Sequence, residues 1–384
     1  MTTFTPVAPE TAPASGTALT GKRRIAFASF VDENYLPGFL VLLRSLALSN
    51  PGVCEDFVVL HDDLKPSSIA RIRALHPRIV LRRVDAEHYD SYVKGDQDNY
   101  LVRKAYFILD IFRLRDYDTV ITLDTDMVVL GDLGELLQLR EGLAAVPQFF
   151  YGQHKLNSGL LVIQREYLSD AFCAKIDQVG RSGSYELDKH DQGILNAVLD
   201  GDFVRLDARY NFVKRRLSGD LPVPDDTAIL HFTGRHKPWQ GGEAGYALAE
   251  DRWREFEMGD AEFHAAYLSK GNLHHDLLVH YGTPHVRRTG DVEAARKVAA
   301  GHIAAGEYQA AVDLLGSVRI PVDEAWPHEV LGHALMSVSR HEEAKTQLLL
   351  ATAAPNRAAT AYARLAQMAW VHGDNAEALK YATA

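Results

Sequence analysis

Two aspartates one residue apart, Asp124 and Asp126, are the residues whose types and spacing first indicate chemistry. They follow Thr119–Leu123, a run with the apolar, β-branched composition of a buried strand. Paired carboxylates at such a position can hold a divalent cation where open α/β sheets bind ligands. A pair of this kind also occurs by chance in exposed turns, but apolar residues lie on both sides here. Because buried carboxylates without a counter-ion are unfavourable, we expect Asp124 and Asp126 to bind Mg²⁺ or Mn²⁺.

A second stretch, His231–Trp239, offers groups that would complete this site. His231 follows an apolar run and could reach the same cation from another element, and an imidazole added to two carboxylates shifts the preference toward Mn²⁺. Gly234 would let backbone amides approach a phosphate, and Lys237 supplies a mobile cation for a diphosphate. A single histidine is more often a core or surface residue, so it is the combination with the acid pair that favours a ligand.

The pattern of apolar runs predicts an α/β fold. Strands are predicted at Arg24–Phe30, Asp56–Leu60, Arg78–Val84 and Thr119–Leu123, and helices at Gly38–Leu46, Ser67–Leu75 and Leu101–Leu114. This alternation is typical of a mostly parallel sheet with helices on both faces. Later elements are predicted as strands at Gly142–Val146, Gly159–Ile163 and Thr227–Phe232, and as helices at Gln192–Val198 and Asp251–Phe256.

Composition limits the classes of function. The 384 residues are 47% apolar and carry a formal net charge of -10, so nothing suggests nucleic-acid binding. Two cysteines, Cys54 and Cys173, cannot form a disulfide framework and fit a reducing compartment. No stretch approaches the roughly 20 apolar residues of a membrane span, and the N-terminus is not patterned as a signal peptide. We therefore expect a cytoplasmic protein whose Thr-, Ala- and Pro-rich residues 1–21 form a disordered tail.

From Thr289 onward the chain is rich in alanine and contains an internal repeat. A small residue recurs at Ala311, Ala344 and Ala378, and another lies twelve residues before each of them, at Ala299, Gly332 and Ala366. Small residues at fixed places let paired helices approach closely, which is how tetratricopeptide units stack. The alternative is an Ala-rich bundle with chance periodicity. The last unit stops at Ala384 without a polar capping helix, which leaves room for the native chain to continue.

The chain resembles glycosyltransferase family 8, the group that contains glycogenin, bacterial lipooligosaccharide galactosyltransferases and plant galactinol synthases. The matching segments are Asn34–Leu46, Leu123–Asp126, Leu156–Leu160, Asp191–Asn196, Arg209–Asn211 and His231–Trp239. Each is weak alone, but the six occur in family order. The resemblance covers roughly residues 22–260 and excludes the repeats.

The internal repeat predicts an all-α tetratricopeptide-like region in residues 286–384. The resemblance implies a GT-A fold, a nucleotide-binding α/β domain, in residues 22–285. It further implies a retaining transferase that uses Mn²⁺ and moves a hexose, glucose or galactose, from a UDP-sugar to a glycan, glycolipid or protein acceptor. The repeats would serve a homodimer or a partner protein.

The resemblance also implies roles for individual residues. Asp124, Asp126 and His231 match the family's metal ligands, and Gly234 and Lys237 match its diphosphate contacts. Tyr35 matches the aromatic that packs on uracil, and the strand backbone of Ala28, Ser29 and Phe30 lies where the base is contacted. The remaining matches, at the donor and around the anomeric carbon of its sugar, are Thr125, Asn157, Asp191 and Gln192.

The predicted catalytic residues are Asp191 and Gln192, either of which could stabilise an oxocarbenium-like sugar as UDP departs. Retention would follow from a covalent intermediate or from same-face attack, and the sequence does not choose between them. Family members carry a basic residue on the helix before the acid pair. Lys104 is the nearest candidate but lies about one helical turn further upstream, so a solvated helix charge is the competing interpretation.

Three alternatives stand beside this hypothesis. The first is a self-glycosylating primer similar to glycogenin. The second is a non-enzymatic interaction protein whose repeats bind a partner and whose transferase domain is a relict; the retained acid pair, His231 and Lys237 argue against it. The third is a nucleotidyltransferase, which the absence of a glycine-rich, basic loop near the first strand disfavours.

Overall fold

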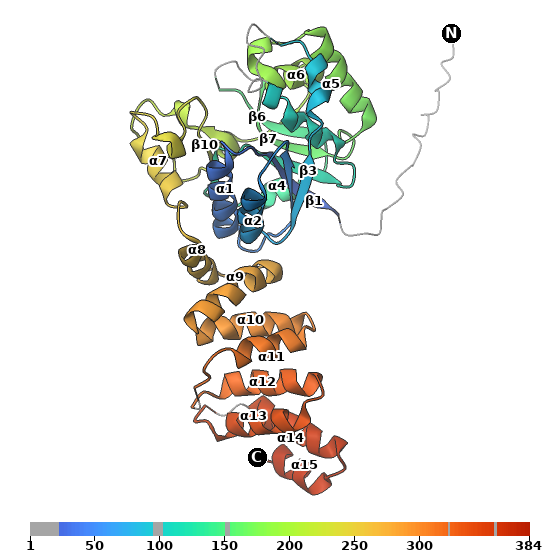
Figure 1. Cartoon of the computed structure of the whole chain (residues 1–384), viewed down its shortest axis with the longest axis vertical. Coiled ribbons are helices and arrows are strands. Elements are labelled where there is room, and N and C mark those ends of the chain that lie inside the picture. The colour runs from blue at the N-terminus through green and yellow to red at the C-terminus, as the bar shows by residue number, and fades with distance from the viewer. Residues whose placement is uncertain (1–22, 95–102, 150–153, 322, 357–358) are drawn as a thin grey trace, which may run out of the picture.

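The computed structural model describes residues 23–384 except 95–102, 150–153, 322 and 357–358 (Figure 1). A part built around β-sheets lies at one end, and a column of paired helices extends from it (Figure 1). We call the helices within residues 260–382 the helical column. The predicted tail, residues 1–21, lies outside the described residues.

The main sheet has seven strands in the order β3-β2-β1-β4-β7-β6-β8. Its strands are β1 (Ile25–Phe30), β2 (Asp56–His61), β3 (Ile79–Arg83), β4 (Thr119–Leu123), β6 (Leu143–Pro147), β7 (Leu156–Gln164) and β8 (Val204–Arg205). The first four strands pair in parallel, whereas β7 runs antiparallel to both β4 and β6. The mostly parallel sheet predicted from the sequence is confirmed, with β7 as its antiparallel member.

A second, three-stranded sheet consists of β5 (Met127–Val129), β10 (Ile229–His231) and β9 (Phe212–Val213). Strand β10 is antiparallel to β5 and parallel to β9, so His231 lies opposite both Met127 and Val213. Because only three residues separate β4 from β5, this pairing brings His231 to the end of the main sheet.

Helices cover both faces of the main sheet. The helices of this part of the chain are α1 (Leu36–Ser49), α2 (Pro66–Leu75), α4 (Gly134–Gln138), α5 (Asp170–Ser182), α6 (His190–Leu199) and α7 (Ala247–Arg254), of which α7 lies to the side of the sheets (Figure 1). Alternate residues of β1 enter different apolar clusters: Phe27 packs with α1 and α2, and Ala28 packs with α5 and α6. This alternation is the period of two expected of a strand buried on both faces.

The long helix predicted at Leu101–Leu114 is wrong. Residues 101–102 lie outside the described part, and the remainder contains a short helical turn at 103–104 and a 3₁₀-helix, η2 (Phe107–Arg113). Aromatic and β-branched residues such as Phe107 and Ile111 have low helix propensity. They are buried in the sheet cluster, so tertiary packing rather than helical periodicity determines this segment.

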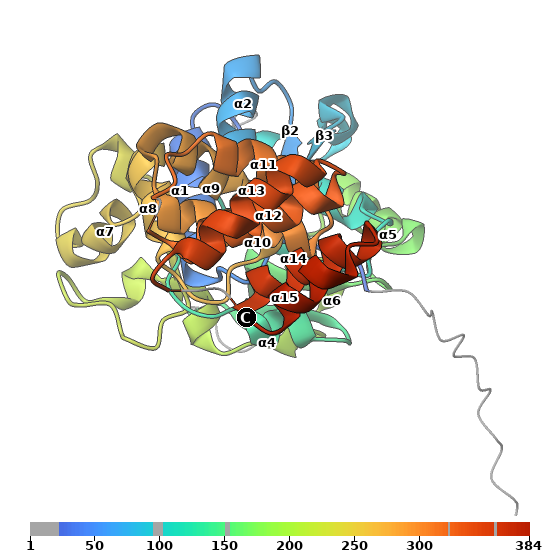
Figure 2. The ribbon, with the colours of Figure 1, turned by 90° about the horizontal axis from the view of Figure 1, so that it is seen from below.

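The helical column comprises α8 (Asp260–Leu268), α9 (His275–Thr289), α10 (Val292–Ala304), α11 (Tyr308–Gly316), α12 (Ala325–Ser337), α13 (His341–Ala353), α14 (Ala359–Val371) and α15 (Asn375–Ala382). Viewed from below, its helices lie in front of the sheets (Figure 2). None of the helices in the described residues is long and apolar enough to cross a bilayer.

The three predicted repeats share one turn geometry. Gly306, Ser339 and Gly373 occupy equivalent positions between paired helices, with φ of 77°, 62° and 81°. Each N–H donates to the carbonyl three residues earlier, and the next N–H in each unit donates to the carbonyl five residues earlier. Close packing accompanies these turns: a Cβ added to Gly332 would lie 2.7 Å from Leu348 Cγ. The periodicity read from the sequence is therefore a helical repeat.

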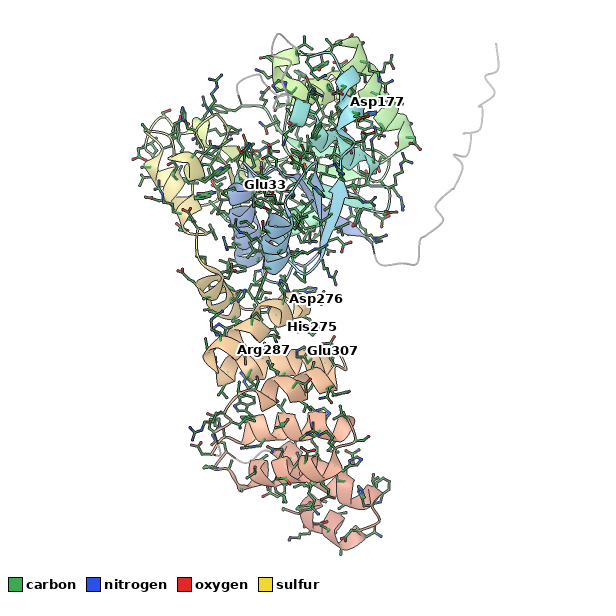
Figure 3. The ribbon with its side chains drawn as sticks, in the orientation of Figure 1. Glu33, Asp177, His275, Asp276, Arg287 and Glu307 are labelled. Carbon is green, nitrogen blue, oxygen red and sulfur yellow. The ribbon has the colours of Figure 1, made fainter. Side chains whose placement is uncertain are left out.

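The column joins the sheets through α8 and α9. The hydroxyl of Tyr281 donates to the carbonyl of Leu75 at 2.6 Å, and that of Tyr267 donates to the carbonyl of Pro51 at 2.7 Å. Asp276, labelled in Figure 3 near the start of α9, pairs with Arg78 at 2.7 Å. The predicted boundary after residue 285 falls within α9 and stays a prediction.

Candidate active site

The acid pair and His231 meet at the end of β4. His231 Nε2 lies 3.2 Å from Asp126 Oδ1 and 3.5 Å from Asp124 Oδ2. One ligand atom from each of the three residues lies within 4.8 Å of the other two. The side chains of His231 and Asp126 are buried, whereas that of Asp124 is 43% exposed. Two carboxylates and an imidazole thus converge on one point with one side open.

Backbone pairing fixes these three residues. The N–H of Asp124 donates to the carbonyl of Gly159 in β7 at 2.9 Å, and the N–H of Phe232 donates to the carbonyl of Asp126 at 2.9 Å. A Cβ on Gly159 would lie 2.5 Å from His231 Cε1 and 2.9 Å from Asp124 Oδ2. Only a glycine leaves room for both groups, and a carboxylate–imidazole set of this kind suits a divalent metal ion.

Two basic side chains, Lys237 and His231, lie beside the acid pair and affect its ionisation. Lys237 Nζ forms an ion pair with Asp126 and donates to the carbonyl of Phe232 at 2.9 Å. Burial opposes ionisation of Asp126, but His231 and Lys237 outweigh it and hold the pKa of this carboxyl well below its usual range. Partial burial raises the pKa of Asp124 to about 6, against the charge of His231 and together with that of Asp126.

A cavity of about 480 Å³ adjoins the acid pair. Its lining includes Phe30, Tyr35, Lys104, Asp124, Asp126, Asp191 and Lys237. The ring of Tyr35 lies edge-on to Trp239 with centroids 5.7 Å apart, and its side chain is 37% exposed. The volume lies within the range of small-molecule sites. An aromatic wall and a set of groups that could hold a metal ion therefore border one cavity.

Asp191 and Gln192, the predicted catalytic residues, lie in the first turn of α6. Asp191 lines the cavity, and burial together with the charge of Asp124 raises its pKa to about 7. Gln192 Oε1 accepts a hydrogen bond from the N–H of Ser158 at 3.3 Å. The preceding His190 has a φ of 48°, a left-handed conformation that is unfavourable for a side chain with a Cβ. Such strain beside Asp191 is typical of functional sites.

Comparison with known proteins decides the family. A sequence model described as Glycosyl transferase family 8 matches residues 26–242, which is more than half of the chain. The chain belongs to glycosyl transferase family 8.

The family 8 chain is 25% identical over 264 residues to glycosyltransferase GlyE of Streptococcus pneumoniae, covering 62% of each protein. It is 26% identical over 244 residues to a lipopolysaccharide 1,2-glucosyltransferase of Escherichia coli, covering 54% of this chain and 71% of that one. A second pneumococcal relative, glycosyltransferase GlyA, is matched over only 34% of its length. The chain thus spans less than two thirds of GlyE and GlyA.

A solved structure shares the fold. The crystal structure of the galactosyltransferase LgtC with donor and acceptor sugar analogues has a TM-score of 0.50 and is 20% identical, covering 60% of this chain and 94% of LgtC. The GT-A fold predicted from the sequence is confirmed, as is the helical region that follows it.

Other predicted residues of this family 8 member occupy different settings. Phe30 and Thr125 line the cavity, but Ala28 and Ser29 are fully buried in β1, where Ser29 Oγ donates to the carbonyl of Leu123 at 2.6 Å. A contact between their backbone and a donor stays a prediction. A Cβ on Gly38 would lie 2.5 Å from the Thr125 carbonyl oxygen, so this glycine lets α1 approach the acid pair.

Lys104 lies in the cavity wall rather than on a solvated helix face. Its side chain is 11% exposed, and Nζ lies 3.2 Å from Asp62 and 3.4 Å from Asp32. The competing interpretation of Lys104 as a solvated helix charge is therefore wrong. Its predicted contact with the donor stays a prediction.

Asn157 and Gly234 are not among the described residues that line the cavity. Gly234 has a φ of 102°, and a Cβ there would lie 2.4 Å from Arg215 Nη2. Asn157 Oδ1 accepts hydrogen bonds from the N–H of Gly159 at 3.0 Å and from Asn211 Nδ2 at 2.8 Å. Their predicted contacts with diphosphate and sugar stay predictions.

Sequence reasoning missed two residues at the site. Asp32 lines the cavity, pairs with Lys104 and accepts hydrogen bonds at 2.9 Å from the N–H groups of Asn34 and Tyr35. Asn211, the residue directly before β9, forms a hydrogen bond with His231. Asn211 lies in the matched segment Arg209–Asn211, but its hydrogen bond with His231 was not predicted.

Proposed function

We propose that this protein is a retaining, Mn²⁺-dependent hexosyltransferase. It transfers glucose or galactose from a UDP-sugar to a glycan, glycolipid or protein acceptor. The observation that carries the proposal is the convergence of Asp124, Asp126 and His231 at one edge of a cavity of about 480 Å³, with Lys237 beside them. Family membership and the names of the relatives support it.

The donor set supports Mn²⁺ as the metal. Two carboxylates are hard ligands that Mg²⁺ and Mn²⁺ share, and the imidazole of His231 favours Mn²⁺, with Mg²⁺ as a weaker substitute. When bound there, the ion would supply positive charge to the diphosphate of UDP as the bond to the sugar breaks. Asp124, Asp126 and His231 would hold the metal.

Residues of the chain would position the rest of the donor. Tyr35 offers an aromatic surface to the uracil, with Ala28, Ser29 and Phe30 along the adjoining strand. Lys237, now paired with Asp126, would turn to the diphosphate with Gly234 and the cavity-lining Thr125 near it. Lys104 and Asn157 are further proposed donor contacts. Fixed charges aimed at the departing phosphate are effective because they need no reorganisation.

Asp191 and Gln192 are the proposed catalytic residues. The bond between the anomeric carbon and the phosphate oxygen breaks, and its electron pair leaves with UDP. The acceptor hydroxyl oxygen bonds to the same carbon, and its proton passes to a phosphate oxygen of the departing UDP. A carboxylate or amide oxygen from Asp191 or Gln192 stabilises the positive charge that develops on the sugar, and a raised pKa keeps Asp191 near its titration at neutral pH.

We further propose that residues 22–285 form the GT-A domain and residues 286–384 tetratricopeptide-like units. The shared turns at Gly306, Ser339 and Gly373 support the second assignment. A homodimer or a partner protein would contact the column. Two cysteines that are both free and buried support a location in the reducing cytoplasm.

The test is a panel of UDP-sugars incubated with purified protein and Mn²⁺, read as UDP release. Release from UDP-glucose or UDP-galactose, lost in Asp126→Ala and retained in Asp116→Ala, is expected. Asp116 is a matched control because it is 62% exposed and paired with Arg82 at 3.1 Å. UDP release from no donor, together with no calorimetric UDP binding, would overturn the proposal. Intact mass after incubation with UDP-glucose detects self-glycosylation.

A further inference from the structure

Three side chains form a hydrogen-bonded chain behind the metal-binding residues. Asn157 Oδ1 lies 2.8 Å from Asn211 Nδ2, and Asn211 Oδ1 lies 2.8 Å from His231 Nδ1. The chain begins at the backbone of Gly159, whose N–H lies 3.0 Å from Asn157 Oδ1. Asn211 is 1% exposed and His231 is 4% exposed, so solvent offers these two residues little substitute for a lost partner.

The direction of every bond in this chain follows from its first member. A backbone N–H can only donate, so the atom of Asn157 that faces Gly159 must be its oxygen. That same oxygen faces Asn211, which must therefore present its NH₂ group there and its oxygen to His231. An oxygen facing Nδ1 requires a proton on Nδ1. Rotating either amide would place two donors or two acceptors against each other, which is costly for buried groups.

The opposite nitrogen of the ring faces the two carboxylates. Nε2 lies 3.2 Å from Asp126 and 3.5 Å from Asp124, on the side where a cation would bind. A neutral imidazole ligates a metal through its unprotonated nitrogen, and the hydrogen bond at the other nitrogen decides which one that is. Because the hydrogen-bond chain keeps the proton on Nδ1, Nε2 is the ring nitrogen that can lose its proton to solvent and offer a lone pair to a metal ion.

We propose that Asn211 is a positioning residue that keeps the proton of His231 on Nδ1, so that Nε2 is the nitrogen that binds the metal. Asn157 anchors Asn211 by fixing its amide orientation. The inference rests on the metal site of the proposed function, although the position of the proton can be measured without metal. This role of Asn157 is separate from its proposed contact with the donor sugar.

The experiment measures the proton and the metal separately. Histidine-selective ¹⁵N NMR of the metal-free and Mg²⁺-loaded protein identifies the His231 ring by its absence in His231→Gln. The wild type is expected to show a slowly exchanging proton on Nδ1 in both states. Electron paramagnetic resonance of free Mn²⁺ gives the Mn²⁺ affinity. Asn211→Leu should lose the protected proton and bind Mn²⁺ about 10–100-fold more weakly, the usual effect of losing such a partner.

Two variants separate positioning from general damage. Asn157→Asp keeps an oxygen that accepts from both Gly159 and Asn211, so the Nδ1 proton should persist. Asn50→Leu is the matched control, since Asn50 is a buried amide whose hydrogen bonds to Gly131 and Leu133 lie away from the site. It should lower the melting temperature without changing the Nδ1 proton or the Mn²⁺ affinity. Should Asn211→Leu fail to fold, Asn157→Leu takes its place, because it frees the Asn211 amide to rotate.

The outcomes are distinguishable. A protected Nδ1 proton that survives in Asn211→Leu, or an unprotonated Nδ1 in the wild type, overturns the inference. An unchanged Mn²⁺ affinity in a folded Asn211→Leu protein that has lost the proton overturns the link to the metal. A wild type that shows the Nδ1 proton but binds neither Mn²⁺ nor UDP overturns the proposed function and leaves the role of Asn211 toward His231 standing.

Discussion

Lys237 and Asp126 form a buried ion pair among the proposed metal ligands. The same carboxylate faces His231 through its other oxygen, so both of its oxygens already have a cationic or polar partner. A metal ion must therefore compete with the ammonium group for Asp126, and a diphosphate offers that ammonium group another partner. Metal and nucleotide binding are expected to favour each other for this reason.

Replacing Lys237 by methionine tests this competition. Without the ammonium group, Mn²⁺ should bind the nucleotide-free protein about tenfold more tightly, equivalent to about 1.4 kcal/mol. UDP in the presence of Mn²⁺ should bind at least tenfold more weakly, because the diphosphate loses a cation. Calorimetry measures both affinities. Lys175→Met removes an exposed lysine from α5 and should change neither affinity. A fall in Mn²⁺ affinity in Lys237→Met would contradict the competition.

Gly159→Ala should impair the metal site while the protein stays folded. The added Cβ would lie 2.5 Å from His231 Cε1, so the imidazole must shift away from the carboxylates. We expect the Mn²⁺ affinity to fall at least tenfold and metal-dependent UDP release to fall with it. Gly271→Ala provides the comparison, since nothing lies within 4 Å of a Cβ at that position. Equal Mn²⁺ affinities of the two variants would argue against the described packing.

Stability should fall as the protein is acidified, partly through His76. Burial and nearby His280 and Arg78 lower the pKa of His76 from 6.5 to about 3. Its Nδ1 also accepts a hydrogen bond from the N–H of Arg78 at 3.1 Å. The unfolded state therefore binds more protons than the folded state between pH 6.5 and pH 3. The stabilisation is complete above pH 6.5 and is lost as the pH falls, by at most about 1.4 kcal/mol per unit.

Urea denaturation at a series of pH values measures this loss. His76→Gln has no titrating ring, so its free energy of unfolding should depend less on pH than that of the wild type between pH 6.5 and pH 4. His264, whose pKa burial lowers to about 4, leaves a residual slope in the variant. Parallel pH profiles of wild type and His76→Gln would rule out the contribution of His76.

Gly332→Val should destabilise the column without affecting nucleotide binding. A Cβ at Gly332 would lie 2.7 Å from Leu348 Cγ, so valine would force α12 and α13 apart at a cost of about 1–3 kcal/mol. Thermal unfolding followed by circular dichroism should show a lower transition temperature. Gly316→Val, at an exposed helix end with nothing within 4 Å of its Cβ, should show a smaller shift. Loss of UDP binding in Gly332→Val would mean that the column and the cavity are coupled.

The sequence predicted the main elements because their patterns are long. Apolar runs of five or six residues mark β1, β2 and β4, and the repeat is visible through positions such as Ala311 and Ala344. The pairing of β5 with β10 could not be predicted, since strands of three residues carry too little pattern. That pairing nevertheless brings His231 to Asp126. The sequence indicated their proximity only through the metal-ligand chemistry of the two side chains.

The proximity of Asp124, Asp126 and His231 was predicted from residue types alone. The ion pair between Lys237 and Asp126 was not predicted, because the sequence indicates a cation near a phosphate site but not which carboxylate that cation contacts. The burial of Lys104 was also hidden, because its acidic partners come from other elements, after β1 and β2. Asn211 was hidden for a different reason, since the direction of a hydrogen bond requires the positions of three side chains.

The attachment of α8 and α9 has a consequence for how a large acceptor would reach the cavity. Their contacts are with Pro51, just after α1, and Leu75, the last residue of α2. The proposed metal ligands Asp124 and Asp126 instead follow the C-terminal end of β4. In Figure 3, Glu33, in the loop before α1, is labelled near one end of α1, and Asp276 of α9 is labelled beyond the other end of α1. Anything anchored on the column is therefore held at least about one strand length, roughly 20 Å, behind the edge that carries the proposed site. A partner held on the column, as proposed, would therefore leave the cavity entrance free for exchange of the proposed donor and its products.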